Sequence, residues 1–142
     1  MKKTLLLLFC FLSTYIYSTI EVDGKLDEPE WDSAKEINQF YEIFPYSLKD
    51  ADFPTKVLIK ETDQGIFFGF SSTQKKGTIR ANQHQRDTHI MRTNADLVGV
   101  MIDFDGDAVT AYDFYVSAGG SVGDAIIKDE RNFDGDWDGD WL

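Results

Sequence analysis

The residues of this chain that could do chemistry gather near its C-terminus, where aspartates alternate with glycines and tryptophans. Asp134, Asp136 and Asp138, followed by Gly139, match the pattern D-x-D-x-D-G that opens a calcium-binding loop. Closely spaced carboxylates repel one another, and a hard cation relieves that repulsion. The glutamate position of such a loop would fall past the last residue, and the flanking helices of an EF-hand are not evident. The pattern therefore predicts either a structural calcium or a solvated acidic turn.

Aromatic residues beside polar loops indicate a second kind of chemistry, the binding of sugars. The apolar face of a pyranose stacks on an aromatic ring, and its hydroxyls need polar partners. Four aromatic residues are candidates for this role: Trp137, Trp141, Tyr46 and Phe53. Aromatic residues make up 14% of the chain, so most of them must lie in the core. The alternative for each of the four candidates is therefore an ordinary structural role in the core or at its rim. Trp31, which follows a turn near the N-terminus, is expected to be buried.

Catalytic signatures are weak by comparison. His84 and His89 lie in a polar stretch without a cysteine or a third histidine nearby, which is too few ligands for a zinc site. The chain contains no H-E-x-x-H and no phosphate-binding glycine loop. Paired carboxylates for glycoside hydrolysis are an alternative in so acidic a chain, but no single pair stands out.

The charge balance narrows the classes of partner. The chain has 142 residues and a formal net charge of −11, with 25 acidic and 14 basic side chains. Such a chain repels nucleic acid and anionic lipid and suits neutral ligands or cations. Solubility alone accounts for most of the acids.

The first residues resemble a secretory signal. Lys2 and Lys3 precede an apolar run from Leu5 to Leu12, and small residues follow before Thr19. The apolar run is short of the roughly 20 residues of a membrane-spanning helix, so we expect cleavage rather than an uncleaved anchor. The expected organisation is a signal peptide at 1–18 and an exported domain at 19–142. Cys10 is the single cysteine, so the exported domain has no disulfide.

Two hairpins organise the elements that would position these side chains. Residues 97–104 form an apolar run, an Asp-Gly turn follows, and residues 112–117 alternate in polarity. The first of these strands lacks polar alternation, so we expect it to be central and covered on both faces. Residues 55–61 and 66–71 form the second hairpin. Further strands are expected at 19–22, 37–44 and 121–128, a weak one near 78–81, short helical turns at 30–34 capped by Asp27, and loops at 45–54 and 72–94. About seven short strands predict an all-β fold, an antiparallel β-sandwich with jelly-roll or immunoglobulin-like layers.

One stretch resembles a known family. Residues 20–31 read I-E-V-D-G-K-L-D-E-P-E-W, similar to the I-D-G-x-L-D-E-x-x-W opening of family 9 carbohydrate-binding modules, with Val22 in place of the isoleucine. Residues 66–70 (IFFGF), 96–103 (DLVGVMID) and 111–120 (AYDFYVSAGG) resemble later strands of that family. The resemblance covers residues 20–142. It implies a β-sandwich that binds sugar without catalysis, carries structural calcium and belongs to polysaccharide-degrading or envelope machinery.

A subgroup of this family resembles the chain more closely. The pair Arg86-Asp87 and the aspartate-tryptophan run suit the family 9-like (DOMON-like) domain at the N-terminus of bacterial outer-membrane β-barrel proteins. A sandwich needs a closing strand after the last acidic loop, and a barrel would follow that domain, so we expect the domain to be incomplete at its C-terminus. The leading hypothesis is an exported, non-catalytic carbohydrate-binding module in the periplasm, at the outer membrane or secreted. The alternatives are a docking domain of an outer-membrane β-barrel protein without sugar affinity, and a fragment of a glycoside hydrolase.

Overall fold

The computed structural model describes residues 19–129 and 131–141, so the predicted signal peptide lies outside the described residues. The described chain is all-β, as predicted, with seven strands in two antiparallel sheets and two short helices. The strands are β1 (Lys35–Ile37), β2 (Thr55–Thr62), β3 (Gly65–Ser72), β4 (Leu97–Ile102), β5 (Thr110–Ser117), β6 (Val122–Lys128) and β7 (Asn132–Asp134). The helices are the 3₁₀ helix η1 (Pro29–Ser33) and α1 (His89–Asn94). Within the described part, no helix is both long and apolar enough to cross a bilayer.

The smaller sheet has the strand order β1-β2-β3 and is covered on one face by η1. Trp31 is buried, as predicted, and packs with Ile20 and Leu58, while its Nε1 donates to Glu28 Oε2 at 2.9 Å. Gly69 makes this approach possible, because a Cβ there would lie 2.5 Å from a methyl carbon of Leu26 and 3.1 Å from the Trp31 ring. The glycine in the predicted IFFGF strand is therefore explained by close packing of η1 on the sheet.

The larger sheet has the order β4-β5-β6-β7 and is covered on one face by α1. Burial along β5 alternates, with Asp113, Tyr115 and Ser117 buried and the residues between them half-buried. Tyr115 packs with Met91 from α1 and lies across the strand pair from Gly123, where a Cβ would meet its ring at 2.5 Å. The predicted alternation of this strand is confirmed.

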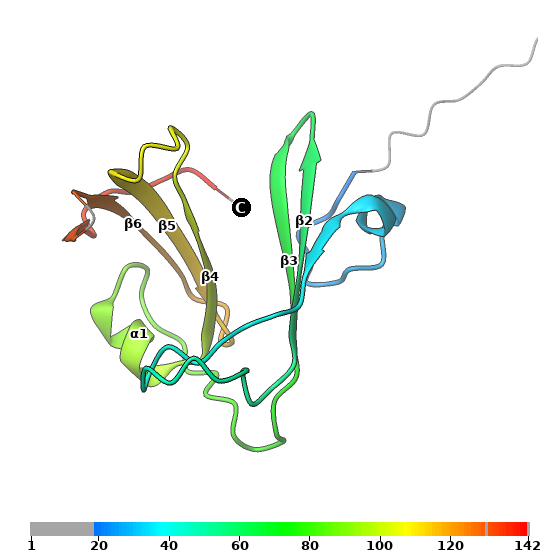
Figure 1. The fold of residues 1–142 in the computed structure, drawn as a ribbon, viewed down its shortest axis with the longest axis horizontal. Helices are drawn as coiled ribbons and strands as arrows, with labels where there is room; N and C mark the ends of the chain where they lie inside the picture. Colours follow the sequence, from blue (N-terminus) through cyan, green and yellow to red (C-terminus); the bar gives the residue numbers. More distant parts are fainter. Residues whose placement is uncertain (1–18, 130, 142) are drawn as a thin grey trace, which may run out of the picture.

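Figure 1 shows how the two sheets sit, converging near the end of β3 and the start of β4 and diverging toward the opposite end. The helices η1 and α1 lie on the outward faces, so the remaining faces look toward each other. Each buried cluster described above lies under a helix. On the facing surfaces Val57 is buried, but Val100, Ile102, Phe114 and Val116 are only half-buried.

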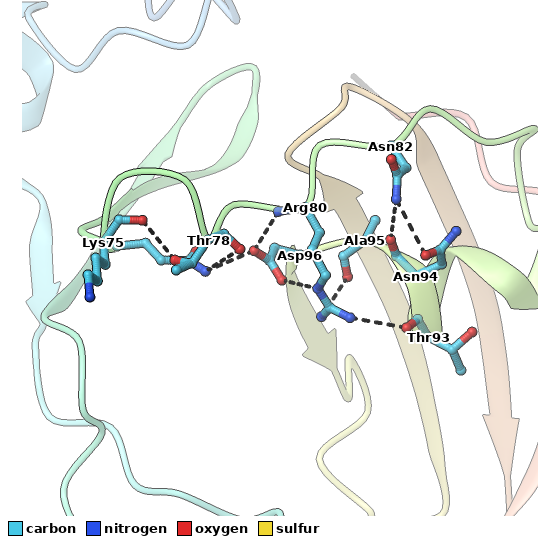
Figure 2. Close-up of polar contacts among 9 residues, drawn as sticks. Lys75, Thr78, Arg80, Asn82, Thr93, Asn94, Ala95 and Asp96 are labelled. Carbon is cyan, nitrogen blue, oxygen red and sulfur yellow. Dashed lines mark hydrogen bonds and ion pairs between the residues drawn. The ribbon is translucent and has the colours of Figure 1, made fainter.

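The connection between the sheets is held at Asp96, just before β4. Its carboxylate accepts hydrogen bonds from the Arg80 backbone N–H at 3.0 Å and from Arg80 Nε at 2.9 Å (Figure 2). It also accepts one from Gln74 Nε2 at 3.0 Å. Arg80 also donates to the Thr93 carbonyl at 3.2 Å and reaches that of Ala95. The hydrogen bonds, the one from the Arg80 backbone first, lower the pKa of Asp96 below its ordinary value of 3.8.

Both predicted hairpins and the strand at 121–128 are confirmed within a residue or two. The expectation of a central first strand at 97–104 is wrong, because β4 is an edge strand and β5 lies inside the sheet. No strand forms at 19–22 or 78–81, the strand expected at 37–44 ends at Ile37, and η1 is flanked by Glu28 instead of Asp27. The loop expected at 72–94 contains α1, and the acidic C-terminal run contains β7.

Candidate ligand-binding site

A buried carboxylate, Asp124, anchors the C-terminal segment to the larger sheet. It lies in β6 on the face directed away from α1, and its side chain is fully buried. Its Oδ2 accepts a hydrogen bond from Trp141 Nε1 at 2.7 Å, and its Oδ1 accepts one from the Gly139 backbone N–H at 3.3 Å. The last described residues therefore cross this face instead of leaving the domain.

Arg86 supplies the positive charge that allows Asp124 to be buried. Its guanidinium pairs with Asp124, lies 2.7 Å from Asp138 Oδ1 and donates to the Gly139 carbonyl at 2.9 Å. Asp87 completes the arrangement by accepting the Asp124 backbone N–H at 2.8 Å. Burial alone would lower the pKa of Arg86, but Asp124 and Asp138 outweigh it and raise that pKa. The loop at 86–87 and the segment at 138–141 are thus tied together over β6.

The two predicted tryptophans lie on this face within a continuous set of ring contacts. The rings touch edge to face in the order Phe104, Tyr112, Trp137, Phe114 and Trp141, with centroid separations of 5.4, 5.1, 5.9 and 5.4 Å. We call these five residues the aromatic strip. Trp137 and Trp141 are half-buried, so each packs on the sheet and keeps part of its ring accessible. Gly139 packs closely against one of them, because a Cβ there would lie 2.6 Å from the Trp137 ring.

The other two predicted aromatics lie elsewhere. Tyr46 is 80% exposed and Phe53 is 46% exposed, and both belong to the segment between β1 and β2. Phe53 lines a shallow pocket of about 120 Å³ with Phe40, Asp50 and their neighbours. In Figure 1 this segment, cyan to teal, lies where the sheets converge, whereas the red C-terminal segment crosses the opposite half. No ring contact among the described residues joins Tyr46 or Phe53 to the aromatic strip.

The predicted calcium ligands are divided between two places. Asp134 pairs with Lys128 at 3.2 Å, and that hydrogen bond lowers the pKa of Asp134. Asp138 instead lies with Asp87 and Asp124 in a group whose carboxylate oxygens are within 4.8 Å of one another. Arg86 already bonds to Asp124 and Asp138 there, so a guanidinium stands where a cation would be held. The residues fit an arginine-bound cage better than a metal site, and the predicted calcium stays a prediction.

The turn between β5 and β6 has the spacing of a hydrolase nucleophile motif but a different setting. Residues 119–123 read G-G-S-V-G, which matches G-x-S-x-G. That motif joins a strand to a helix and exposes its serine, whereas this turn joins two antiparallel strands and buries Ser121. Ser121 Oγ accepts the His84 backbone N–H at 2.7 Å, so the serine serves to hold the loop at 84.

Sequence reasoning missed Asp124 as the centre of the site. Its signal is readable in retrospect, because it is the single acid inside the otherwise apolar strand of residues 122–127. A charged side chain at a sheet position that faces the interior requires a partner. Nothing in the sequence says that this partner is Arg86, 38 positions earlier.

Comparison of the chain with family models, with curated proteins and with solved structures found no match. The family 9 resemblance rests on the residues quoted above.

Proposed function

We propose that this chain is an exported, non-catalytic carbohydrate-binding module whose two sheets are the layers of a β-sandwich. The observation that carries the proposal is the placement of Trp137 and Trp141, half-exposed and bound to one sheet face. Rings held in this way offer stacking surface without the entropy cost of ordering loose side chains.

Hydrogen-bonding groups border the same rings. Asp136 and Asp140 belong to the same segment as Trp137 and are exposed, and Asp138 is 73% exposed although it touches Arg86. Carboxylates accept hydrogen bonds from sugar hydroxyls, so the border can orient a sugar whose apolar face lies on a ring. The surrounding negative charge favours neutral sugars over uronic or sulfated ones.

A glycan array probed with the folded protein tests this proposal. We expect the wild-type protein to bind a neutral sugar chain or its end. Trp137→Ala should weaken this binding by at least about tenfold, because it removes a stacking surface. Phe44→Ala is the matched control, since Phe44 is 94% exposed and lies outside the aromatic strip. Equal binding by wild type and Trp137→Ala contradicts the proposal.

A docking domain on an outer-membrane β-barrel is the second candidate. It is favoured by the facing sheet surfaces, where Val100 and Ile102 are half-buried although a closed sandwich would cover them. Absence of glycan binding in a folded sample, together with capture of a barrel partner, selects this candidate.

A further inference from the structure

A hairpin-like loop between β1 and β2 carries a tip of unpaired apolar side chains. Tyr41 and Asp50 form an isolated antiparallel bridge at its base. The Glu42 N–H donates to the Lys49 carbonyl at 2.8 Å, and the Ala51 N–H donates to the Phe40 carbonyl at 2.8 Å. Ser47 Oγ donates to the Glu42 carboxylate across the loop. These hydrogen bonds give the loop a defined shape, so the exposure of the apolar side chains at its tip is a consequence of the fold.

The tip is unusually apolar for a surface loop. Ile43 is 73% exposed, Phe44 94%, Tyr46 80% and Leu48 55%. We call these four residues the apolar tip. Single exposed apolar residues are ordinary on soluble proteins, but four large ones within six positions of one loop are a concentration of apolar surface that needs an occupant.

The distribution of charge identifies the kind of occupant. No residue from Ile43 to Leu48 is charged, whereas Glu42, Lys49 and Asp50 lie at the base of the loop. An apolar end above a charged base matches the change from acyl chains to headgroups at a bilayer surface. The aromatic tip residues, and the Tyr46 hydroxyl, suit that boundary.

The net charge of the chain indicates which binding partner of the apolar tip is favoured. At a net charge of −11, two copies of the chain repel one another, and so do the chain and an anionic lipid surface. Side chains as exposed as Phe44 would need a matching pocket on a protein partner, but a bilayer accepts them without one. We infer that the apolar tip inserts into the headgroup boundary of a neutral, zwitterionic membrane. This inference is independent of the sugar site.

Vesicles of phosphatidylcholine test the inference on the full chain. The deciding probe is local, since the apolar run at 5–12 is common to every variant. Phe44→Trp places an indole in the apolar tip, and Ile79→Trp places one at a site 54% exposed elsewhere. We expect lipids brominated on their acyl chains to quench the added fluorescence of Phe44→Trp and to leave that of Ile79→Trp unchanged.

A second experiment introduces a charge into the apolar tip and measures vesicle binding. Phe44→Glu should raise the lipid concentration for half-maximal binding by at least about tenfold, because an apolar side chain is lost and a carboxylate enters the interface. Trp137→Ala should bind vesicles like wild type, which separates this surface from the sugar site. Circular dichroism of each variant confirms that the fold is kept.

Two outcomes would overturn the inference. In the first, the added fluorescence of Phe44→Trp is not quenched and Phe44→Glu binds vesicles as wild type does. In the second, the protein forms a dimer without lipid in ultracentrifugation and Phe44→Glu makes it monomeric, so that the occupant is a second copy.

Discussion

Asp124 shows at the scale of single residues how this protein positions its aromatic side chains. Its carboxylate is fully buried and is bonded by Arg86, Trp141 and the Gly139 backbone. One carboxylate thus fixes a loop and the C-terminal segment on the same strand.

Replacing this carboxylate should loosen the site and the fold together. Asp124→Asn removes the charge that pairs with Arg86, and we expect the free energy of unfolding to fall by roughly 2–4 kcal/mol, as when one partner of a buried pair is removed. Urea unfolding followed by circular dichroism measures this loss. Asp136→Asn, at an exposed position of the C-terminal segment, is the control and should change stability little. An equal effect of both variants would contradict the anchoring role of Asp124.

Gly139 is expected to matter for binding more than for stability. A Cβ at this position would lie 2.6 Å from the Trp137 ring, so Gly139→Ala must move that ring. We expect weaker sugar binding with a near-normal unfolding midpoint, and titration calorimetry beside thermal unfolding compares the two. Gly135→Ala is the matched control, since the nearest atom to a Cβ there is at 3.8 Å. Unchanged binding in Gly139→Ala would show that the position of Trp137 is unimportant.

Added calcium tests whether the carboxylates around Arg86 can bind a metal ion. Because Arg86 already pairs with all three carboxylates of the group of Asp87, Asp124 and Asp138, we expect millimolar calcium to leave the melting temperature of the wild type unchanged. Arg86→Gln frees the carboxylates, and its melting temperature should rise with calcium. A calcium-dependent melting temperature in the wild type would instead support the calcium loop predicted from the sequence.

At the scale of elements, the link between the two sheets depends on Asp96. Its lowered pKa means that its stabilising effect is full above its ordinary pKa of 3.8 and is lost as the pH falls through the lower value of the folded state. At neutral pH, Asp96→Ala should lower the free energy of unfolding by about 1–3 kcal/mol, because three hydrogen-bond donors lose their acceptor.

The pH dependence makes this prediction specific. The stability difference between wild type and Asp96→Ala should shrink as the pH falls below 3.8, and unfolding measured from neutral to acid pH follows it. Asp52→Ala, on an exposed loop, is the control. A difference that stays constant with pH would mean that Asp96 acts by packing alone.

Local patterns predicted the hairpins well and their neighbours less well. The alternation of 112–117 and the turn at 63–65 are decided by nearby residues, and both predictions are confirmed. The position of β4 at a sheet edge is a property of the topology, and the apolar run of this strand did not predict that position. The stretch at 19–22 illustrates the same limit, since Ile20 is buried under Trp31 without joining a ladder. Of the predicted ligand-binding aromatics, Trp137 and Trp141 share one face, while Tyr46 and Phe53 belong to another region.

At the scale of the whole molecule, the proposed functions occupy different regions of one acidic chain. The aromatic strip lies on the larger sheet, and the apolar tip lies on the segment between β1 and β2. Sugar binding should respond to Trp137→Ala but not Phe44→Ala, and vesicle binding should show the reverse. A protein that binds a surface through one region and a glycan through the other is consistent with the envelope setting that the family resemblance implies.

The central claim, that a sugar stacks on the aromatic strip, is tested most directly by the indole N–H signals in a nitrogen-labelled NMR spectrum. The chain has three tryptophans, and Trp31 is an internal control because it is buried where η1 packs on the smaller sheet and is bonded to Glu28. As a neutral oligosaccharide selected on the array is added, we predict that the signals of Trp137 and Trp141 shift in proportion to binding while that of Trp31 stays fixed. Saturable binding with all three signals unmoved would contradict the claim.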